Sequence, residues 1–303
     1  MADARELSEL FRRNFPLAVR EEEAVLRILG HRDNRVLARR DASGRLMGAA
    51  VTRSDAVLLL CVDEAHRRQG LGAALLAEAE GLIRAAGHRR VVVGAGEDYL
   101  TPGVPTSKRY CPAENEALYP GLTEEASRFF EKRGYRHSWD CNCFDMRLTL
   151  ADWNPPAWRN GMALEGVVYR WAEPEDRAAA CACVEDAWPE FTRYYKSESL
   201  YGGDPARRVM IAEVGGLVAG ALMVSLEAEG PGLGSVGCTA VRPAFRGRHI
   251  AVNLVRLSTA HLKASGMRDA FLGYTYSGLD HMYGYAGYKI CAYYMMAQKR
   301  FEA

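Results

Sequence analysis

The sequence predicts an α/β (α+β) fold of two similar domains in tandem, each a mixed, mostly antiparallel sheet flanked by helices. Three observations lead to this prediction. The chain has 303 residues, and a domain commonly takes about 150. The order strand, basic loop, helix, strand occurs twice along the chain. A single shift of 179 residues, which brings Val62 onto Val241, overlays the two copies without a gap.

The first copy opens with a hairpin, in which Arg35–Arg40 and Leu46–Val51 flank a turn rich in Asp, Ser and Gly. An apolar run of strand length follows at Ala56–Val62. The segment Leu71–Ala86 gathers its large apolar residues near one face, which indicates a helix, and a glycine ends it. The short apolar run Arg90–Val93 predicts a buried strand.

The remaining elements are expected in the same order in both copies. In the first copy they are a short helix at Glu124–Arg133 and a final strand pair within Trp139–Leu148. The segments predicted for the second copy are the hairpin Arg208–Glu213 and Leu217–Leu226, the strand Val236–Val241, the helix Ile250–Ser265, the strand Ala270–Tyr274, the short helix Leu279–Ala286 and the strand pair Lys289–Ala297.

We therefore expect an N-terminal domain over residues 1–150, a linker over 151–166 and a C-terminal domain over 167–303. Pro155 and Pro156 discourage regular structure in the linker. The first half also carries an insertion that includes Asp98–Pro105 and Cys111. Two interpretations of the insertion remain, a functional loop and a rigid surface loop held by its prolines.

Composition excludes several classes of protein. The formal net charge of +1 gives no basic face for nucleic acid. No apolar run approaches the roughly 20 residues of a membrane helix, and the N-terminus has no signal-peptide core. The eight cysteines show no C-x-x-C spacing, so we expect reduced, mostly buried thiols and no metal site. The expected protein is cytoplasmic and a monomer or homodimer.

A basic loop follows the central strand in each copy. The two loops read Arg67-Arg68-Gln69-Gly70-Leu71-Gly72 and Arg246-Gly247-Arg248-His249-Ile250-Ala251. A loop that enters a helix presents free backbone N–H groups and the positive end of the helix dipole, and glycine lets an anion approach closely. This pattern indicates a phosphate site. A dinucleotide fold would need G-x-G-x-x-G, but Leu75 stands at the last glycine position.

This order of elements, with Arg/Gln-x-x-Gly-x-Gly/Ala in the loop, resembles the GNAT superfamily of N-acetyltransferases over nearly the whole chain, twice. The first loop fits the pattern fully, and the second departs from it at His249. The resemblance implies acetyl-CoA as cofactor, with its pyrophosphate on the loops and its pantetheine arm along a splayed strand. The residues it implies for acetyl-CoA are Cys61, Val62, Arg67, Arg68, Gln69, Gly70, Leu71, Gly72, Thr239, Val241, Arg246, Gly247, Arg248, His249, Ile250 and Ala251.

The resemblance also implies a proton donor. In many GNAT enzymes a tyrosine four residues before the glycine that ends the late helix protonates the departing thiolate. Tyr283 holds this position in the second half, whereas Phe130 holds it in the first and has no proton to give. We therefore expect the second half to be catalytic, with simple packing of Tyr283 as the alternative.

The general base and the acceptor are less constrained by the sequence. Glu227 is the first candidate for the base and Glu229 the second, although the pattern favours solvated turn residues for both. Asp63 and Glu64 flank the first loop. The aromatic and acidic run Glu185–Tyr195 could hold a cationic amine, or it could be a helix that covers the sheet.

The reaction expected from these features is transfer of an acetyl group from acetyl-CoA to a primary amine, and the expected acceptor is a small molecule. Two other classes of function stay open. One is an acyl-CoA-binding or regulatory protein without turnover, which the departures from the family pattern at Phe130 and His249 favour. The other is a scaffold in which one half serves only for assembly.

Overall fold

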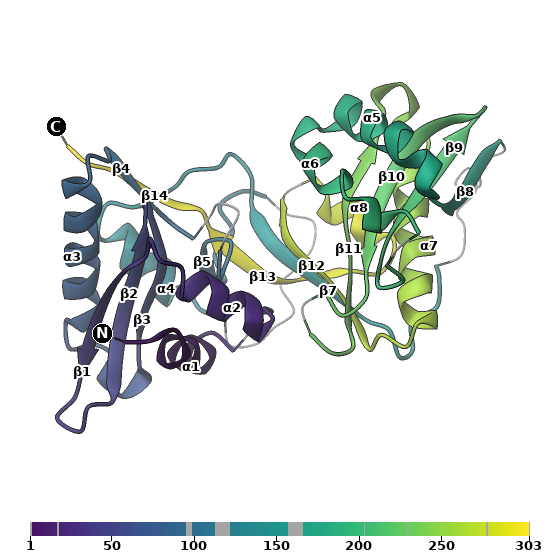
Figure 1. The fold of residues 1–303 in the computed structure, drawn as a ribbon. Helices are drawn as coiled ribbons and strands as arrows, with labels where there is room; N and C mark the ends of the chain where they lie inside the picture. Colours follow the sequence, from purple (N-terminus) through teal and green to yellow (C-terminus); the bar gives the residue numbers. More distant parts are fainter. Residues whose placement is uncertain are drawn as a thin grey trace. The chain divides into compact units, whose positions relative to one another are not determined.

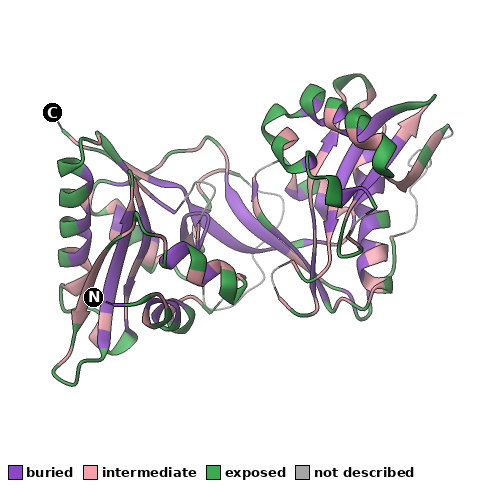
Figure 2. Ribbon diagram, viewed as in Figure 1, coloured by how far each residue is buried: buried purple, intermediate pink, exposed green. Residues whose placement is uncertain are grey.

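The computed structural model describes residues 2–16, 18–94, 99–112, 122–156, 166–202, 204–228, 230–276 and 278–302. The chain packs into two units (Figure 1). Unit 1 holds the described residues up to Phe144 together with 292–302, and unit 2 holds those from Asp145 to Cys291. In both units the strands are mostly buried and the outer faces of the helices are exposed (Figure 2).

Unit 1 is a six-stranded sheet with helices on both faces. Its helices are α1 (Ala4–Asn14), α2 (Glu22–Leu29), α3 (Leu71–Ala85) and α4 (Glu125–Glu131). Its sheet has the order β1 (Arg35–Arg40), β2 (Leu46–Arg53), β3 (Ala56–Val62), β4 (Arg90–Val93), β14 (Ala297–Arg300) and β6 (Arg136–His137). Apolar side chains of α1 and α2 pack on one face of the sheet, and those of α3 and α4 on the other. The short strand β5 (Val104–Thr106) lies outside this sheet.

The last strand of the chain lies inside the sheet of unit 1. Gln298 of β14 is paired with Val92 of β4 on one side and with Arg136 of β6 on the other. Lys299 forms an ion pair of 2.8 Å with Glu80 of α3. The strand pair predicted at Lys289–Ala297 is therefore not confined to the C-terminal domain, because β14 completes the sheet of the first.

Unit 2 repeats the architecture. Its sheet has the order β8 (Val167–Trp171), β9 (Arg207–Val214), β10 (Leu217–Ser225), β11 (Leu233–Val241), β12 (Asp269–Tyr276) and β7 (Cys143–Thr149, from Asp145 onward). Its helices are α5 (Arg177–Ala187), α6 (Thr192–Tyr195), α7 (Ile250–Ala264) and α8 (Asp280–Gly284). Strand β13 (Lys289–Met295) leaves this unit after Cys291.

Strand β7 also departs from the predicted arrangement. It closes the first copy in the sequence, yet Asp145 accepts a hydrogen bond of 2.9 Å from the backbone N–H of Tyr274 at the end of β12. Arg147 of β7 forms an ion pair of 2.7 Å with Asp269 of the same strand β12. Each half of the sequence thus contributes a late strand to the sheet of the other, and the boundaries 1–150 and 167–303 do not coincide with the units at these strands.

The two units share a close approach of helix to sheet. Gly48 lies opposite Val62 at the end of β3, and a Cβ on Gly48 would lie 3.3 Å from Leu75 of α3. Gly220 lies opposite Val241 at the end of β11, and a Cβ there would lie 3.2 Å from Leu254 of α7. The missing side chains let each long helix begin directly above the end of its central strand.

Candidate functional site

The two basic loops have the same backbone conformation. Gly70 and His249 precede the first turns of α3 and α7, and their φ angles are 83° and 57°, both left-handed. Arg68 and Gly247, two residues earlier, are also left-handed, with φ of 64° and 75°. Neither helix start has a side-chain cap, so side chains leave its first N–H groups available to an anion. The departure at His249 leaves the loop geometry intact.

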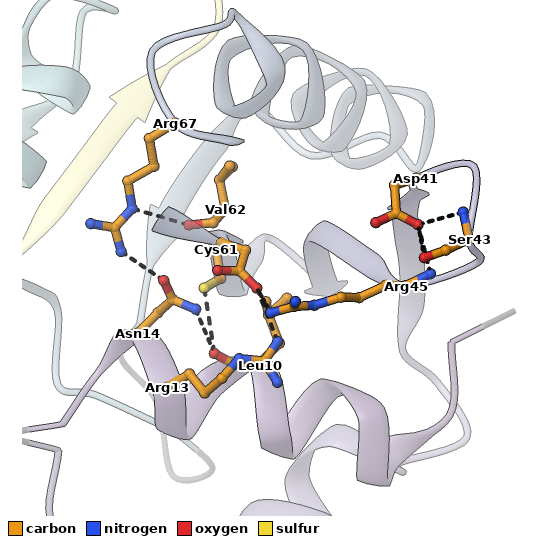
Figure 3. Close-up of polar contacts among 10 residues, drawn as sticks. Leu10, Arg13, Asn14, Asp41, Ser43, Arg45, Cys61, Val62 and Arg67 are labelled. Carbon is orange, nitrogen blue, oxygen red and sulfur yellow. Dashed lines mark hydrogen bonds and ion pairs between the residues drawn. The ribbon is translucent and has the colours of Figure 1, made fainter. Parts of the chain in front are cut away.

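The first arginine of each loop holds the loop against the strand before it. Arg67 donates from Nε to the Val62 carbonyl at 3.1 Å and from Nη2 to Oδ1 of Asn14 at 2.6 Å (Figure 3). Arg246 donates from Nε to the Val241 carbonyl at 3.2 Å and from Nη2 to the Ala187 carbonyl at 3.1 Å. These two guanidinium groups shape the loops. The exposed Arg68 forms an ion pair of 2.9 Å with Glu125 of α4, and Arg248 lies over the Phe245 ring.

A carboxylate at the end of β3 fixes helix α1. Asp63 accepts hydrogen bonds from Arg13 at 3.2 Å and from Arg45 at 3.1 Å. Burial by itself would raise the pKa of Asp63, but the charges and hydrogen bonds of the two arginines outweigh it, and the pKa is lowered. Because it is held as a paired carboxylate, Asp63 serves to anchor α1. Glu64 lies in the single 3₁₀ turn Glu64–His66 that follows.

In both units the ladder between the two central parallel strands ends before the first of these strands does. In unit 1 the register of β3 with β4 ends at Val57 and Val93, while β3 continues to Val62. In unit 2 the register of β11 with β12 ends at Ser235 and Phe271, while β11 continues to Val241. Such an opening leaves backbone N–H and C=O groups of the strand end facing the gap, where an extended ligand can pair with them.

A cavity of about 610 Å³ opens at the first loop, entirely within unit 1. Its wall combines the loop, the end of β3, α4 and the segment after α1 with residues of β5 and β13. The residues that line it are Asn14, Phe15, Pro16, Ala18, Leu60, Cys61, Val62, Arg67, Arg68, Gly70, Gly72, Ala73, Thr101, Pro105, Leu122, Thr123, Glu125, Ala126, Phe129, Phe130, Arg133, Ala292 and Tyr294. A Cβ added at Gly70 would meet nothing within 4 Å, so the loop backbone is open to a ligand here.

Most residues predicted for the first cofactor site lie on this wall. Cys61, Val62, Arg67, Arg68, Gly70 and Gly72 line the cavity, whereas Gln69 and Leu71 are not among its lining residues. Phe130 lines it too and is packed edge-on against Tyr135, with ring centroids 5.1 Å apart. The first half therefore combines a formed cavity with an apolar ring at the position of the expected acid.

In the second half Tyr283 reaches the splayed strand. Its hydroxyl lies 3.2 Å from Oγ1 of Thr239 on β11, and its side chain is buried. Burial raises the pKa of Tyr283 to about 12, against a smaller opposite effect of Thr239. The phenol therefore keeps its proton at neutral pH, as a general acid must.

The strand carries a bulge beside this contact. Cys238 has a left-handed φ of 49°, and the register of β10 with β11 shifts between Ala221 and Met223. The hydroxyl of Tyr195 donates to the Cys238 carbonyl at 2.7 Å. Tyrosines of two different helices thus bind consecutive residues of β11, and neither the bulge nor the role of Tyr195 was anticipated from the sequence.

The structure does not bring Glu227 to this place. Ser225 pairs with Ser235 at the start of β11, and Glu227 lies in the turn beyond it. By this register Glu227 is level with Leu233, six residues before Thr239 on β11. At about 3.3 Å per residue, the distance along the strand is roughly 20 Å. Glu227 is therefore at the opposite end of the strand from Tyr283, and the expectation that it is the base for that site is not supported by the register. Glu229 lies outside the described residues.

The aromatic run predicted for the acceptor forms a surface around Trp188. The Trp188 ring stacks on Tyr276 at the end of β12, with centroids 6.2 Å apart, and packs near Phe191 at 6.1 Å. Trp188 is 44% exposed and Tyr194 42%. We call Trp188, Phe191, Tyr194 and Tyr276 the aromatic surface; its strand member, Tyr276, was not singled out in the sequence.

Two family models match the sequence, one in each half. Residues 32–137 match an acetyltransferase (GNAT) domain, and residues 166–285 match the acetyltransferase (GNAT) family. No curated protein is similar enough in sequence to match. In the part of the chain that the structure describes, no helix is long and apolar enough to cross a membrane.

Solved structures share the two-domain fold at low identity. A GCN5-related N-acetyltransferase from Sphaerobacter thermophilus is 21% identical, with a TM-score of 0.68, over 98% of this chain and 92% of its own. A tandem GNAT protein from the clavulanic acid biosynthesis pathway is 17% identical, with a TM-score of 0.60, over 98% and 94%. A GCN5-related glucosamine N-acetyltransferase region in a fungal multi-domain beta-N-acetylglucosaminidase is 19% identical, with a TM-score of 0.74; the match covers 98% of this chain and spans 37% of the fungal protein.

Proposed function

We propose that this chain, which belongs to the GNAT superfamily and carries two GNAT domains in tandem, transfers an acetyl group from acetyl-CoA to a primary amine of a small molecule. The observation that carries the proposal is the cavity in unit 1, which joins the start of α3 to the splayed end of β3. The N–H groups of an uncapped helix start and the nearby Arg68 suit the pyrophosphate of coenzyme A. The end of β3, which continues beyond its last pair with β4, suits the pantetheine arm, which carries amide groups.

The second half supports the chemical step of the proposal. In this half an amine attacks the thioester carbonyl carbon, the new C–N bond forms and the C–S bond breaks. Tyr283, whose burial keeps it protonated, donates its phenolic proton to the departing thiolate. Thr239 orients the phenol through the contact between their hydroxyls. The amine loses its own proton to water, because the register leaves Glu227 too far away to accept it.

The aromatic surface supports an amine as acceptor. Aromatic faces attract cations and stack on apolar rings. Tyr276 contributes to the electrostatic environment of Tyr283 and stacks on Trp188, so the surface leads from solvent toward the proposed acid. Glu190, which follows Trp188 by two residues, adds negative charge.

Calorimetry with acetyl-CoA tests the cofactor sites. The variants Gly70→Glu and Ala251→Glu each place a carboxylate where one pyrophosphate is proposed to bind. Gly81→Glu and Ala264→Glu, at exposed positions of the same two helices, are the matched controls. We expect each loop variant to remove one site and the controls to keep both. A wild-type protein that binds no acetyl-CoA would contradict the proposal.

Turnover distinguishes an enzyme from an acyl-CoA-binding protein. Phe130 in the wall of the cavity favours the latter as the second candidate, at least for the first half. The assay separates free CoA from acetyl-CoA by chromatography after incubation with spermidine, glucosamine or lysine. Amine-dependent release of CoA supports the acetyltransferase. Binding without release from any amine would favour the second candidate.

A further inference from the structure

A tyrosine from the far end of the sequence lines the cavity of the first half. Tyr294 lies on β13, and the cavity wall includes both Tyr294 and Ala292. Side chains alternate along a strand, so residues 292 and 294 face the same side and Tyr293 faces the other. Tyr293 packs instead edge-on against Phe144, with ring centroids 6.2 Å apart.

The position of Tyr294 is held by the backbone. In the ladder of β13 with β5, Tyr294 pairs with Pro105, between the pairs of Tyr293 with Thr106 and Met295 with Val104. Strand β14 begins at Ala297, two residues after Met295, and is itself held between β4 and β6. The Tyr294 ring is only 3% exposed, so its place on the wall is built into unit 1.

Three other polar groups on this wall are poorly suited to donate a proton. Oγ1 of Thr101 already donates to the Gly103 carbonyl at 2.8 Å. Arg133 donates to the Phe129 carbonyl and stacks over the Phe129 ring, and an arginine does not give up its proton in proteins. The Cys61 thiol is buried and donates toward the Leu10 carbonyl at 3.8 Å, on the side of helix α1.

We propose that Tyr294 is the proton donor of a second acetyl-transfer centre, located in the cavity of the first half. Phe130 has no hydroxyl, and Tyr294 of β13, in the C-terminal segment that belongs to unit 1, supplies the phenol instead. An amine attacks the thioester carbonyl, the C–N bond forms, and the C–S bond breaks. The thiolate takes the phenolic proton of Tyr294, the amine gives its proton to water, and water reprotonates the phenolate. This inference rests on the proposed function, because it requires acetyl-CoA in the cavity.

The test isolates the first half by removing the proposed acid of the second. In a Tyr283→Phe background, Tyr294→Phe is compared with Tyr293→Phe, which removes the same hydroxyl from the opposite face of β13. Free CoA is measured by chromatography with spermidine, glucosamine and lysine as acceptors. Calorimetry on the same proteins reports acetyl-CoA binding at the first loop, with Gly70→Glu as the reference for a lost site.

We expect Tyr283→Phe to retain amine-dependent CoA release. In that background Tyr294→Phe should lower the remaining kcat at least about tenfold, since a general acid commonly contributes about 100-fold or more. Acetyl-CoA affinity at the first loop should stay within about twofold, and Tyr293→Phe should keep the rate. Loss of all release in Tyr283→Phe alone would overturn the inference, as would a rate unaffected by Tyr294→Phe. A wild-type protein with no release at all would overturn the proposed function as well, so the two failures are distinguishable.

Discussion

Gly70 and His249 occupy equivalent positions at the starts of α3 and α7, and both have a left-handed backbone. This conformation is free of strain for glycine but costs other residues about 1–2 kcal/mol. Each loop carries one such cost, because the other left-handed position holds Arg68 in the first half and Gly247 in the second. The second half adds an imidazole beside the proposed pyrophosphate. The loop conformation is retained in both halves although the glycine is retained in only one.

Replacing His249 with glycine should tighten acetyl-CoA binding in the second half, because it removes the side chain nearest the proposed phosphate site. Stability should change by less than about 1 kcal/mol, since relief of strain is offset by the greater freedom of glycine in the unfolded chain. Calorimetry and urea unfolding measure the two effects. Gly70→His is the reverse change and should weaken binding in the first half. Weaker binding in His249→Gly would mean that the imidazole itself holds the phosphate.

Removing the Tyr283 hydroxyl should lower the kcat of the second half by about 100-fold or more, the usual contribution of a general acid. Acetyl-CoA affinity should be retained. Tyr285→Phe, on the same short helix, removes a hydroxyl that contacts His281 and should keep the rate. These rates are measured with the first-loop site removed by Gly70→Glu.

The pH profile gives a separate check on Tyr283. Its pKa is raised by burial to about 12, so the phenol stays protonated from pH 6 to 10. We therefore expect no loss of kcat with an apparent pKa near 10, the ordinary value of a tyrosine. An alkaline limb near 10 that disappears in Tyr283→Phe would contradict the assignment of an upward shift.

A proline near the C-terminus should destabilise the N-terminal unit. Gln298 lies between β4 and β6. Gln298→Pro removes a backbone N–H and introduces a ring inside the sheet, and a hydrogen-bonding group left without its partner costs about 1–3 kcal/mol. Hydrogen exchange should show faster opening of Arg90–Val93 in β4. Glu302→Pro, beyond the last strand, is the control. Unchanged protection of β4 in Gln298→Pro would show that β14 is not part of this sheet.

Two thiols, the buried Cys183 and the partly buried Cys238, should make the protein less stable at alkaline pH. Burial raises the pKa of Cys183 and that of Cys238 to about 11 each, from an ordinary value of 9.0. A raised folded-state pKa gives stability that is complete below pH 9 and is lost as the pH rises toward 11, because the unfolded chain releases its protons first. Each thiol accounts for up to about 3 kcal/mol of this loss. Urea unfolding at pH 7.5 and 10 measures it.

The matched variant for this prediction is Cys183→Ala with Cys238→Ala. It should be less stable at pH 7.5, because one buried and one partly buried side chain are shortened. The difference in stability between pH 7.5 and 10 should nevertheless become smaller than in the wild type. An unchanged difference would assign the alkaline loss to other groups.

Local features of the fold were predictable from the sequence alone. The repeat placed strands β3 and β4 at their observed bounds and α3 to within one residue at its end, because apolar periodicity and terminal glycines are properties of neighbouring residues. The spacing of four residues between Tyr283 and Gly287 was also predictable, because both residues belong to one short helix and the turn that ends it. The loop residues of the first half were predicted for the same reason, and most of them line the cavity.

The sequence by itself determined that the chain holds two copies of one strand–loop–helix unit, each with a loop suited to phosphate. Only the tertiary structure decided which strand completes which sheet, that Glu227 lies far from Tyr283, and that Tyr294 shares a cavity with Phe130. The physical reason is that a β-strand satisfies its hydrogen bonds with any partner of suitable register, however distant in the chain. The pattern of one strand therefore predicts its two faces, but its neighbours follow from the packing of the whole unit.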